Sequence, residues 1–289
     1  MNRAEPTWRW WPAPAKLNLF LHITGRQADG YHNLQTVFQL LDWCDEIGIE
    51  VSDNGVIERI AGPADIPVGT DLAIRAAQAL QAATRCQLGA RLRVRKRVPT
   101  GGGLGGGSSD AATVLVVLNQ LWGTGLAPAA LAEIGLALGA DVPVFVYGSS
   151  AWGEGRGEQL TPIDPPERWF VIIHPGVAVS TAEIFQAPEL TRNSPLITIR
   201  ALSPGLMGQA RNDCEPVVRA RYPAVADAIE WLSRSAPARL TGTGSCVFAA
   251  FERVADAERV AARVPEQWTS RVARGLARSP LLEALDAQR

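Results

Sequence analysis

The sequence predicts a protein of mixed α-helices and β-strands arranged in two domains. First, 289 residues exceed the length of a typical single domain, about 150 residues, and are enough for two. Second, segments with the alternating pattern of strands and segments with the period of helices follow one another without an internal repeat. Third, the stretch from Gly153 to Pro166 is rich in glycine and then proline. We therefore place a boundary near residue 160, between domains 1–160 and 161–289.

Composition and charge exclude several classes of protein. Hydrophobic residues make up 47% of the chain and charged residues 20%, as in ordinary globular proteins, which argues against wholesale disorder. The net charge of −1 gives no reason to expect a nucleic-acid partner. No apolar run approaches the roughly 18 residues of a membrane span, and no signal-peptide core is visible near the N-terminus. Nothing in the sequence indicates an obligate protein partner.

The cysteines indicate the cellular compartment. The chain contains four, and they lie far apart without a C-x-x-C pair, so that neither a zinc site nor a redox motif is predicted. Reduced thiols are the simpler interpretation. We therefore expect a cytoplasmic protein.

The first predicted strand covers residues 16–23, where leucine and isoleucine alternate with a second, mixed face that carries Lys16 and Asn18. A turn follows at Asp29-Gly30. From residue 34 to 41 the apolar positions have helical spacing, whereas the β-branched and aromatic residues suit a strand. Periodicity alone does not decide between the two.

The remaining elements are predicted by caps and periodicity. Asp71 is the expected N-cap of a helix, and a basic strand is expected at 91–98. After a glycine-rich segment, Ser108, Ser109 or Asp110 is the expected cap of a helix with an apolar stripe. Further helices are predicted at 128–138, 223–232 and 252–264, and further strands at 168–174 and 246–251.

The glycine-rich segment is the strongest chemical signal in the chain. Six of the seven residues from Gly101 to Gly107 are glycine, between a predicted strand and a predicted helix. Glycine allows backbone N–H groups to approach phosphate oxygens, and a helix N-terminus adds partial positive charge. The alternative is a flexible linker. A Walker loop is not predicted because Ser108, and not lysine, follows Gly107, and no strand ending in an acidic residue follows to support a dinucleotide fold.

Five segments in register are similar to the GHMP family of small-molecule kinases: PAPAKLNLFLHITGRQADGYH (12–32), the glycine-rich segment, GADVPVF (139–145), NDCEP (212–216) and LTGTGSCVFAAF (240–251). The resemblance covers residues 12–276. It implies a two-domain α+β fold, with an N-terminal ATP-binding domain like the second domain of ribosomal protein S5 and a ferredoxin-like C-terminal domain. It also implies that residues 34–41 form a strand and that the active site lies between the domains.

The resemblance assigns two catalytic residues. Lys16 matches the family's catalytic lysine and Asp141 its catalytic aspartate. Asp141 stands at a junction between predicted elements, where a carboxylate can face a cleft, although capping of the next helix is an alternative role. Lys16 on a strand would otherwise be taken for a solvated side chain.

The same resemblance implies ATP as co-substrate, with Mg²⁺ expected on its phosphates but no dedicated metal-ligand set assigned to the chain. The residues predicted to bind ATP are Pro99, Thr100, Gly101, Gly102, Gly103, Leu104, Gly105, Gly106, Gly107, Ser108 and Ser109.

Substrate identity depends on aromatic residues. The resemblance implies that Tyr31 and Phe185 stack on the two faces of a cytosine while His32 bonds its edge, chemistry that suits a pyrimidine. Core packing is the alternative for Phe185. Asn18 and Thr181 complete the predicted substrate site, whereas a hydroxyl role for Thr241 and a role for Asn212-Asp213 stay open.

The resemblance implies a kinase that phosphorylates a hydroxyl of a small cytidylyl-linked alcohol on the route to isoprenoid precursors. Two alternatives remain. Another kinase of the same family, with a different small alcohol as substrate, would share the glycine-rich segment. A non-catalytic nucleotide-binding module would share it too, but would tolerate the loss of Lys16 or Asp141.

Overall fold

The structure is a computed structural model in which residues 8–28, 30–198 and 211–288 are described. The strands of these ranges are β1 (Arg9–Arg26), β2 (His32–Ser52), β3 (Ile57–Ala61), β4 (Gly89–Arg95), β5 (Ala151–Glu154), β6 (Gln159–Pro162), β7 (Trp169–His174), β8 (Ala238–Leu240), β9 (Val247–Phe251) and β10 (Thr269–Leu276). The helices are α1 (Leu72–Thr84), α2 (Gly106–Leu121), α3 (Pro128–Leu136), α4 (Val142–Tyr147), α5 (Thr181–Gln186), α7 (Glu215–Arg221), α8 (Pro223–Ser233), α9 (Val254–Ala261) and α10 (Pro280–Asp286), with a short 3-10 helix at Val68–Thr70.

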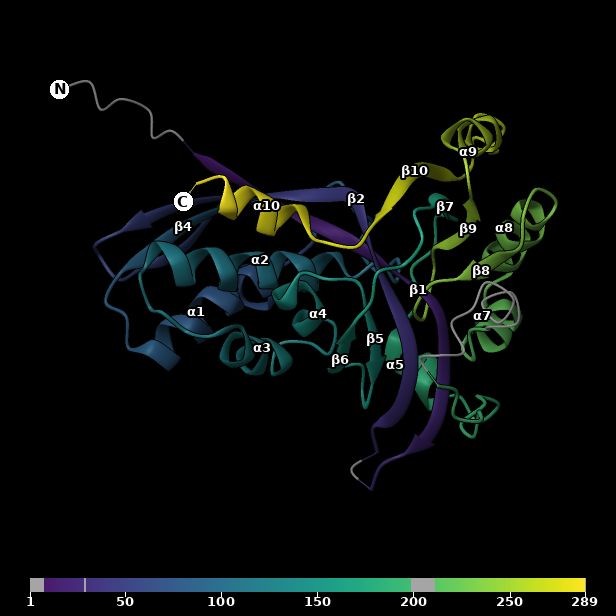
Figure 1. Cartoon of the computed structure of the whole chain (residues 1–289), viewed down its shortest axis with the longest axis horizontal. Helices are drawn as coiled ribbons and strands as arrows, with labels where there is room; N and C mark the ends of the chain where they lie inside the picture. The colour runs from purple at the N-terminus through teal and green to yellow at the C-terminus, as the bar shows by residue number, and fades with distance from the viewer. Residues whose placement is uncertain (1–7, 29, 199–210, 289) are drawn as a thin grey trace.

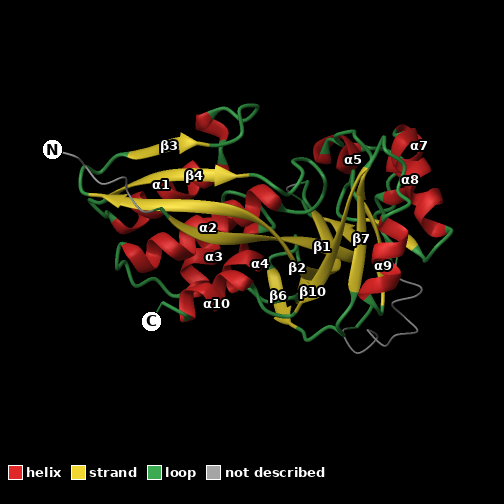
Figure 2. Cartoon of the chain, turned by 90° about the horizontal axis from the view of Figure 1, so that it is seen from above, coloured by secondary structure: helices red, strands yellow, loops and turns green. Residues whose placement is uncertain are grey.

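The strands join in one sheet in the order β3-β4-β2-β10-β7-β9-β8, with β1 and β5 also paired to β2, and β6 to β5. Helices α1, α2 and α3 lie against the N-terminal half of this sheet, and α7, α8 and α9 lie at its other end (Figures 1 and 2). Strand and helix content is therefore mixed, as predicted. Because the sheet runs on through β10, the predicted boundary near residue 160 stays a prediction.

A long antiparallel hairpin of β1 and β2 extends through both halves of the molecule (Figure 1). Residues 34–41 form part of β2, as the resemblance implies. The predicted strand at 16–23 lies inside β1, but its second face is not mixed in exposure. Lys16 is only 2% exposed and Asn18 3% exposed, so both faces of this strand are buried and its polar side chains must find partners inside the protein.

The glycine- and proline-rich stretch from residue 153 contains regular structure. Strands β5 and β6 form an antiparallel hairpin there, and β5 pairs with β2. Glycines at 155 and 157 adopt positive φ in the turn, and Pro162 ends the outer strand, where no ladder donor is needed. This composition therefore belongs to a hairpin at the edge of the sheet.

Helix α2 begins three to five residues earlier than predicted. Its N-cap is Gly105, in the left-handed conformation with φ of 70°, and no side chain caps the helix. Ser108, Ser109 and Asp110, the predicted caps, lie inside the first turns. In contrast, Asp71 caps α1 as predicted, since its side chain accepts a hydrogen bond from the N–H of Ala73.

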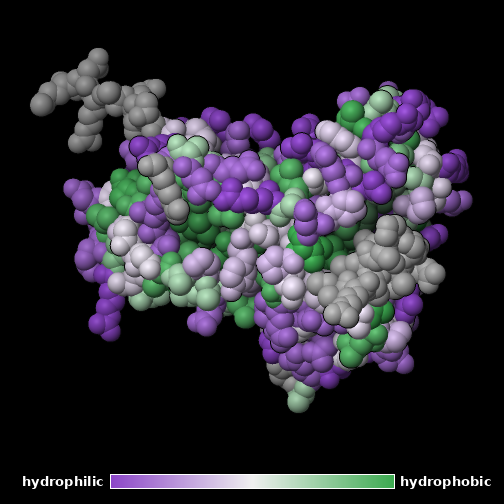
Figure 3. Space-filling model, viewed as in Figure 1, coloured by the Kyte–Doolittle hydropathy of each residue, from purple (hydrophilic) through white to green (hydrophobic). Residues whose placement is uncertain are grey.

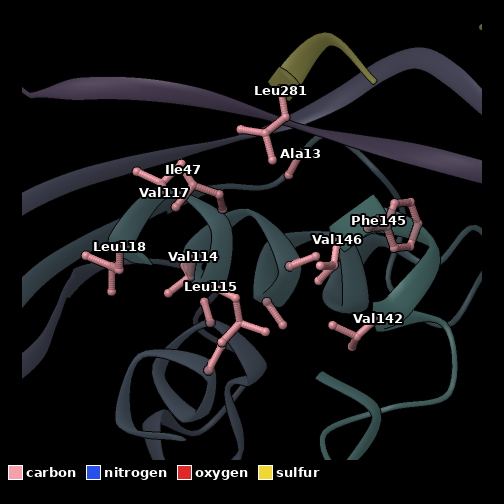
Figure 4. Packing of buried hydrophobic residues seen from close by; sticks show 14 of the residues in the cluster. Ala13, Ile47, Val114, Leu115, Val117, Leu118, Val142, Phe145, Val146 and Leu281 are labelled. Atoms are coloured by element: carbon pink, nitrogen blue, oxygen red, sulfur yellow. The ribbon is translucent and has the colours of Figure 1, made fainter. Parts of the chain in front are cut away.

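Two large hydrophobic cores support the two ends of the sheet. In the first, α2 packs beneath β1 and β2 beside α4, and α10 returns from the end of the chain to cover it (Figure 4). The labelled side chains of Figure 4 show this convergence: Ala13, Ile47, Val114, Leu115, Val117, Leu118, Val142, Phe145, Val146 and Leu281. The second core lies between the C-terminal strands and helices α7, α8 and α9. The long hairpin is thus fixed at both ends.

The elements predicted in the C-terminal half are present within one to three residues of their predicted bounds. Strands β7 and β9 pair antiparallel, β8 joins β9, and β10 joins β7. Among the described residues, no helix has the length and apolar character needed to cross a membrane. Hydrophilic side chains cover much of the lower part of the molecule in Figure 3, where the tip of the β1–β2 hairpin projects.

Candidate active site

A cavity of about 670 Å³ opens between the glycine-rich segment, the β1–β2 hairpin and α5. This volume is in the range of sites that hold small molecules. The cavity is lined by every residue predicted for the site except Ser109: Lys16, Asn18, Tyr31, His32, Pro99, Thr100, Gly101, Gly102, Gly103, Leu104, Gly105, Gly106, Gly107, Ser108, Asp141, Thr181 and Phe185. Ser109 is fully buried within α2. The chain thus brings together residues that are far apart in the sequence.

The glycine-rich segment forms a concave backbone turn in front of α2. Gly101, Gly103 and Gly105 adopt positive φ values of 70°, 73° and 70°, alternating with residues in ordinary conformations. Alternation of this kind turns successive N–H groups toward a common point and creates an anion-binding nest. The 16-residue helix α2 begins directly after it and adds its N-terminal partial charge.

The carbonyl groups of the same segment are bound by the protein. Gly101 O and Gly102 O accept hydrogen bonds from the backbone N–H groups of Ser245 and Cys246, and Leu104 O accepts one from Lys16 N. The segment is therefore seated between β1 and the turn before β9. This arrangement occupies its acceptors on the protein side, which suits a loop whose donors hold a ligand.

Substitution of Gly103 by alanine is expected to weaken ATP binding strongly. An added Cβ would lie 2.2 Å from the carbonyl oxygen of Thr241, and φ of +73° disfavours any L side chain. Strain of about 1–3 kcal/mol is typical of such positions and corresponds to a rise of about 5- to 150-fold in the KM for ATP. Steady-state kinetics with varied ATP measure the effect.

The matched control is Gly69→Ala, because a Cβ at Gly69 meets no atom within 4 Å and its φ is ordinary. We expect its KM for ATP to equal that of the wild type. Equal KM values for the two variants and the wild type would show that the conformation of Gly103 is not required.

Lys16 and Asp141 meet at the floor of the cavity. The Nζ of Lys16 lies 3.2 Å from Oδ2 of Asp141, and it also donates to Oδ1 of Asn18 at 2.5 Å and to the carbonyl oxygen of Gly103 at 3.1 Å. The lysine is buried, whereas the aspartate side chain is 33% exposed. A held ammonium thus lies beside a carboxylate that faces the cavity, directly below the glycine-rich segment.

The backbone of Asp141 occupies the N-cap position of α4, but its side chain makes no capping hydrogen bond. Its carboxylate faces Lys16 instead. The role of helix cap, the alternative that the sequence left open, is therefore not the role that the side chain performs. A capping aspartate would be directed at backbone N–H groups of its own helix.

Asn18 connects this centre to residues from both halves of the chain. Its Nδ2 donates to Oγ1 of Thr36 at 2.9 Å, and its backbone N–H donates to Oγ1 of Thr241 at 2.9 Å. The hydroxyl of Thr241 in turn lies 3.3 Å from the carbonyl oxygen of Gly103. The sequence left the role of the Thr241 hydroxyl open. In the structure it joins β1 to the glycine-rich segment.

The other end of the cavity is aromatic. The rings of His32 and Phe185 are stacked, with centroids 5.2 Å apart and planes inclined by 26°. Tyr31 is 57% exposed, and the guanidinium carbon of Arg156 lies 3.8 Å from its ring centroid. The hydroxyl of Thr181 lies 2.9 Å from that of Thr243. The predicted base-binding residues therefore come together on one side of the cavity.

His32 is held in its neutral form. Burial lowers its pKa, and the positive charges of Arg192 and Arg26 lower it further. The Nε of Arg192 donates a hydrogen bond to Nε2 of His32 at 3.1 Å. At neutral pH this imidazole is therefore uncharged, with one nitrogen already occupied.

Sequence reasoning missed several residues of this region. Arg156 lies in the stretch that was taken for a domain boundary, and Arg192 lies outside every motif. Asn212 was left undecided, and its side chain donates to the carbonyl oxygens of Leu240 and Gly242, which holds the turn before β9 in place. A lone arginine or asparagine in a loop carries no local signal of such contacts.

Comparisons with known proteins agree with this geometry. Residues 71–149 match the model of the GHMP kinases N terminal domain, and residues 194–270 match that of the GHMP kinases C terminal domain. The chain is 58% identical over 277 residues to the 4-diphosphocytidyl-2-C-methyl-D-erythritol kinase of Alkalilimnicola ehrlichii, which covers 96% of this chain and 94% of that one. It is 57% identical over 277 residues to the enzyme of the same name from Halorhodospira halophila, with 95% of each covered. The chain belongs to the GHMP kinase family.

Solved structures agree with this assignment. This GHMP kinase resembles a crystal structure of 4-(cytidine 5'-diphospho)-2C-methyl-D-erythritol kinase with a TM-score of 0.80 and 30% identity, covering 92% of this chain and 99% of that one. It also resembles homoserine kinase from Cytophaga hutchinsonii, with a TM-score of 0.70, 17% identity and 96% and 98% of the chains covered, a likeness of fold alone. The two-domain α+β fold implied by the resemblance is confirmed.

Proposed function

We propose that this GHMP kinase transfers the γ-phosphoryl group of ATP to the 2-hydroxyl of 4-diphosphocytidyl-2-C-methyl-D-erythritol, giving the 2-phosphate and ADP on the route to isoprenoid precursors. Two relatives named for this substrate are 58% and 57% identical to the chain over nearly its full length. The observation that carries the proposal within the molecule is the cavity itself. One end has the nest and the Lys16–Asp141 pair, and the other has the aromatic residues that suit a pyrimidine.

In the proposed reaction the substrate hydroxyl oxygen bonds to the γ-phosphorus while the bond from that phosphorus to the β–γ bridging oxygen breaks. ADP leaves with the electron pair. The carboxylate of Asp141 accepts the hydroxyl proton, and the ammonium of Lys16 orients the hydroxyl and stabilises negative charge on the transferred group. Positioning and electrostatics supply most of the acceleration in phosphoryl transfer, which suits a site whose lysine is fixed by several partners.

Mg²⁺ that accompanies ATP fits the oxygen donors of the cavity. The described residues include no group of three or more His, Cys, Asp or Glu side chains that could hold a metal ion. Mg²⁺ at a nucleotide site takes most ligands from phosphates and water and needs only one or two from protein. Ser108 lines the cavity at the start of α2, and its hydroxyl would hold the ion there. The ion would neutralise phosphate charge during transfer.

The compartment is proposed from the cysteines. All four are unpaired, with Cys214 and Cys246 buried, and the pKa of Cys214 is raised to about 12 by burial and by Asp213. Buried thiols in this form are inert and stay reduced. We propose that the enzyme acts in the cytoplasm on a small-molecule substrate.

The proposed function is tested by measuring ADP release by the purified protein with Mg-ATP, with and without 4-diphosphocytidyl-2-C-methyl-D-erythritol. Strong stimulation by this substrate supports the proposal. If ATP binds and this alcohol stimulates nothing, whereas homoserine, mevalonate or another small alcohol does, then the chain is a GHMP kinase with a different substrate. If no alcohol stimulates ADP release from a protein that binds ATP, the chain is a nucleotide-binding module.

His32→Ala is expected to raise the KM for the cytidylyl substrate by about 10- to 100-fold and the KM for ATP by less than about twofold. The reason is that the variant loses a directed polar contact and a stacked ring, which together correspond to about 1–3 kcal/mol. Steady-state kinetics with each substrate varied in turn give both constants. An equal rise in the two KM values would show that His32 supports the cavity as a whole and does not bind the base.

A further inference from the structure

Arg192 lies outside the cavity lining but bonds two residues that line it. Its Nε donates to Nε2 of His32, and one terminal nitrogen donates to the carbonyl oxygens of Phe185 at 3.0 Å and Ala187 at 2.7 Å. The other terminal nitrogen donates to the carbonyl oxygen of Leu190 at 3.0 Å. One guanidinium therefore joins the start of β2 to the end of α5 and the loop that follows it.

The bond from Arg192 fixes the position of the imidazole proton. Arginine is always protonated and can only donate, so Nε2 of His32 must accept with its lone pair. A neutral imidazole with Nε2 unprotonated carries its proton on Nδ1. No described residue accepts a hydrogen bond from Nδ1, and His32 lines the cavity. The ring therefore offers an N–H donor for a ligand in the cavity.

On the basis of the proposed function, we infer that Arg192 is a positioning residue for substrate recognition. It holds His32 as the Nδ1–H tautomer beside the ring of Phe185, so that the cavity presents one hydrogen-bond donor and one stacking ring to a pyrimidine with an acceptor on its edge. Cytosine offers such acceptors at O2 and N3. Nothing in the local sequence around Arg192 indicates this role, because the contact joins residues 160 positions apart.

A pH dependence follows from the same contact. The charged groups that act on His32 are Arg192, from the loop after α5, and Arg26, from β1. Protonation of His32 would place a second N–H against the N–H of Arg192. Affinity for the cytidylyl substrate should therefore fall as the pH drops through the His32 pKa, which lies below the usual 6.5. Arg192→Met removes one of the two charges and should move this loss to a higher pH.

The tautomer is measured directly by ¹⁵N NMR of the imidazole nitrogens at pH 8. The chain contains only three histidines, so comparison with the spectrum of His32→Gln assigns the signals. We expect His32 in the wild type to be protonated on Nδ1 and the Arg192→Met variant to populate both tautomers. A wild-type His32 protonated on Nε2 would overturn the inference without the use of any variant. An unchanged tautomer in Arg192→Met would do so as well.

Binding and kinetics test the consequence for the substrate. For Arg192→Met we expect the Kd for cytidine 5'-diphosphate and the KM for the cytidylyl substrate to rise about tenfold, with the KM for ATP changed less than about twofold. Arg192→Lys keeps the charge but lacks the planar fork, so it should show most of the same increase. Wild-type constants in the lysine variant would show that charge alone is sufficient and would overturn the positioning role.

Arg219→Met is the matched control, because Arg219 is a half-exposed residue of α7 whose ion pair is with Glu215 of the same helix. It should bind cytidine 5'-diphosphate as the wild type does. Failure of the proposed function is recognised separately. Suppose that Arg192→Met loses both the binding of cytidine 5'-diphosphate and the Nδ1–H tautomer of His32, and that the cytidylyl alcohol does not stimulate ADP release by the wild type. This result would support the role of Arg192 and contradict the proposed substrate.

Discussion

Asp141→Asn is expected to lower kcat by at least about 10²-fold, equivalent to about 2.7 kcal/mol of transition-state stabilisation. An amide has the shape of the carboxylate but cannot accept the hydroxyl proton. Its oxygen can still face the Nζ of Lys16, which lies 3.2 Å from Oδ2 in the wild type, so the geometry of the site should persist. We therefore expect the loss in kcat, with the KM for ATP changed by less than about threefold.

The measurement is single-turnover phosphoryl transfer with the cytidylyl substrate, which separates the chemical step from product release. Asp227→Asn serves as the control, because Asp227 lies exposed on α8 and is distant in sequence from every site residue. A rate near that of the wild type in Asp141→Asn would remove this residue from the role of base. Catalysis would then depend on Lys16 and the phosphate-binding backbone alone.

The sequence was sufficient to predict structural features that depend only on neighbouring residues. The cap at Asp71 was predicted because a side chain can reach the N–H of Ala73 two residues on, and only neighbouring residues decide that geometry. The N-cap of α2 was not predicted. It is Gly105, whose left-handed conformation depends on the packing of the glycine-rich segment. An added Cβ there would lie 2.9 Å from the ring of Phe145. Tertiary contacts thus moved the start of this helix.

The burial of both faces of β1 could not be predicted from the local sequence pattern either. A strand with Lys16 and Asn18 on one face looks half-solvated, since lysine is rarely buried without partners. The partners come from elsewhere: Asp141 from the segment before α4, Gly103 from the glycine-rich segment and Thr36 from β2. Only the resemblance to a family brought Lys16 and Asp141 together before the structure did. The spacing between them carries no such information.

Nothing in the sequence indicated the residues that support the site or the fold through contacts with residues distant in the chain. The family motifs identify side chains that line the cavity, such as His32, but not Arg192, which bonds it from behind. The three-residue cluster of Lys96, Asp45 and Asp110 was missed for the same reason. Its members come from β2, from the segment after β4 and from α2. Each one alone looks like a solvated charge.

Lys96→Met is expected to lower the free energy of unfolding by about 3–5 kcal/mol, since it leaves two buried carboxylates without their cation. Lys96 Nζ bonds to Oδ2 of Asp45 and lies 2.9 Å from Oδ2 of Asp110. Asp45 is fully buried, and its other oxygen accepts the N–H groups of Arg97 and Val98 at 2.5 and 2.8 Å. Removal of one partner from such a cluster costs much more than removal of a surface ion pair.

The loss of unfolding free energy in Lys96→Met should depend on pH. Burial raises the pKa of Asp110 to about 7, although Lys96 opposes the rise. Because the folded pKa exceeds the unfolded value, this group makes the folded state less stable as the pH rises from about 4 to 7. Without Lys96 the pKa of Asp110 rises further, so the loss of stability extends to higher pH. The difference between variant and wild type should therefore be larger at pH 8 than at pH 6.

Urea denaturation at these two pH values measures the loss, and Arg91→Met is the control because it removes a partly exposed ion pair with Glu50. That control should cost less than about 1 kcal/mol. A cost for Lys96→Met no greater than that of Arg91→Met would show that the buried carboxylates find other compensation. The position of the cluster gives the result a functional meaning, since a Cβ at Gly106 would lie 3.1 Å from Lys96 Nζ. Through Asp110, the cation that stabilises the fold thus ties the first turns of α2 to β2, close to where the phosphates of ATP are proposed to bind.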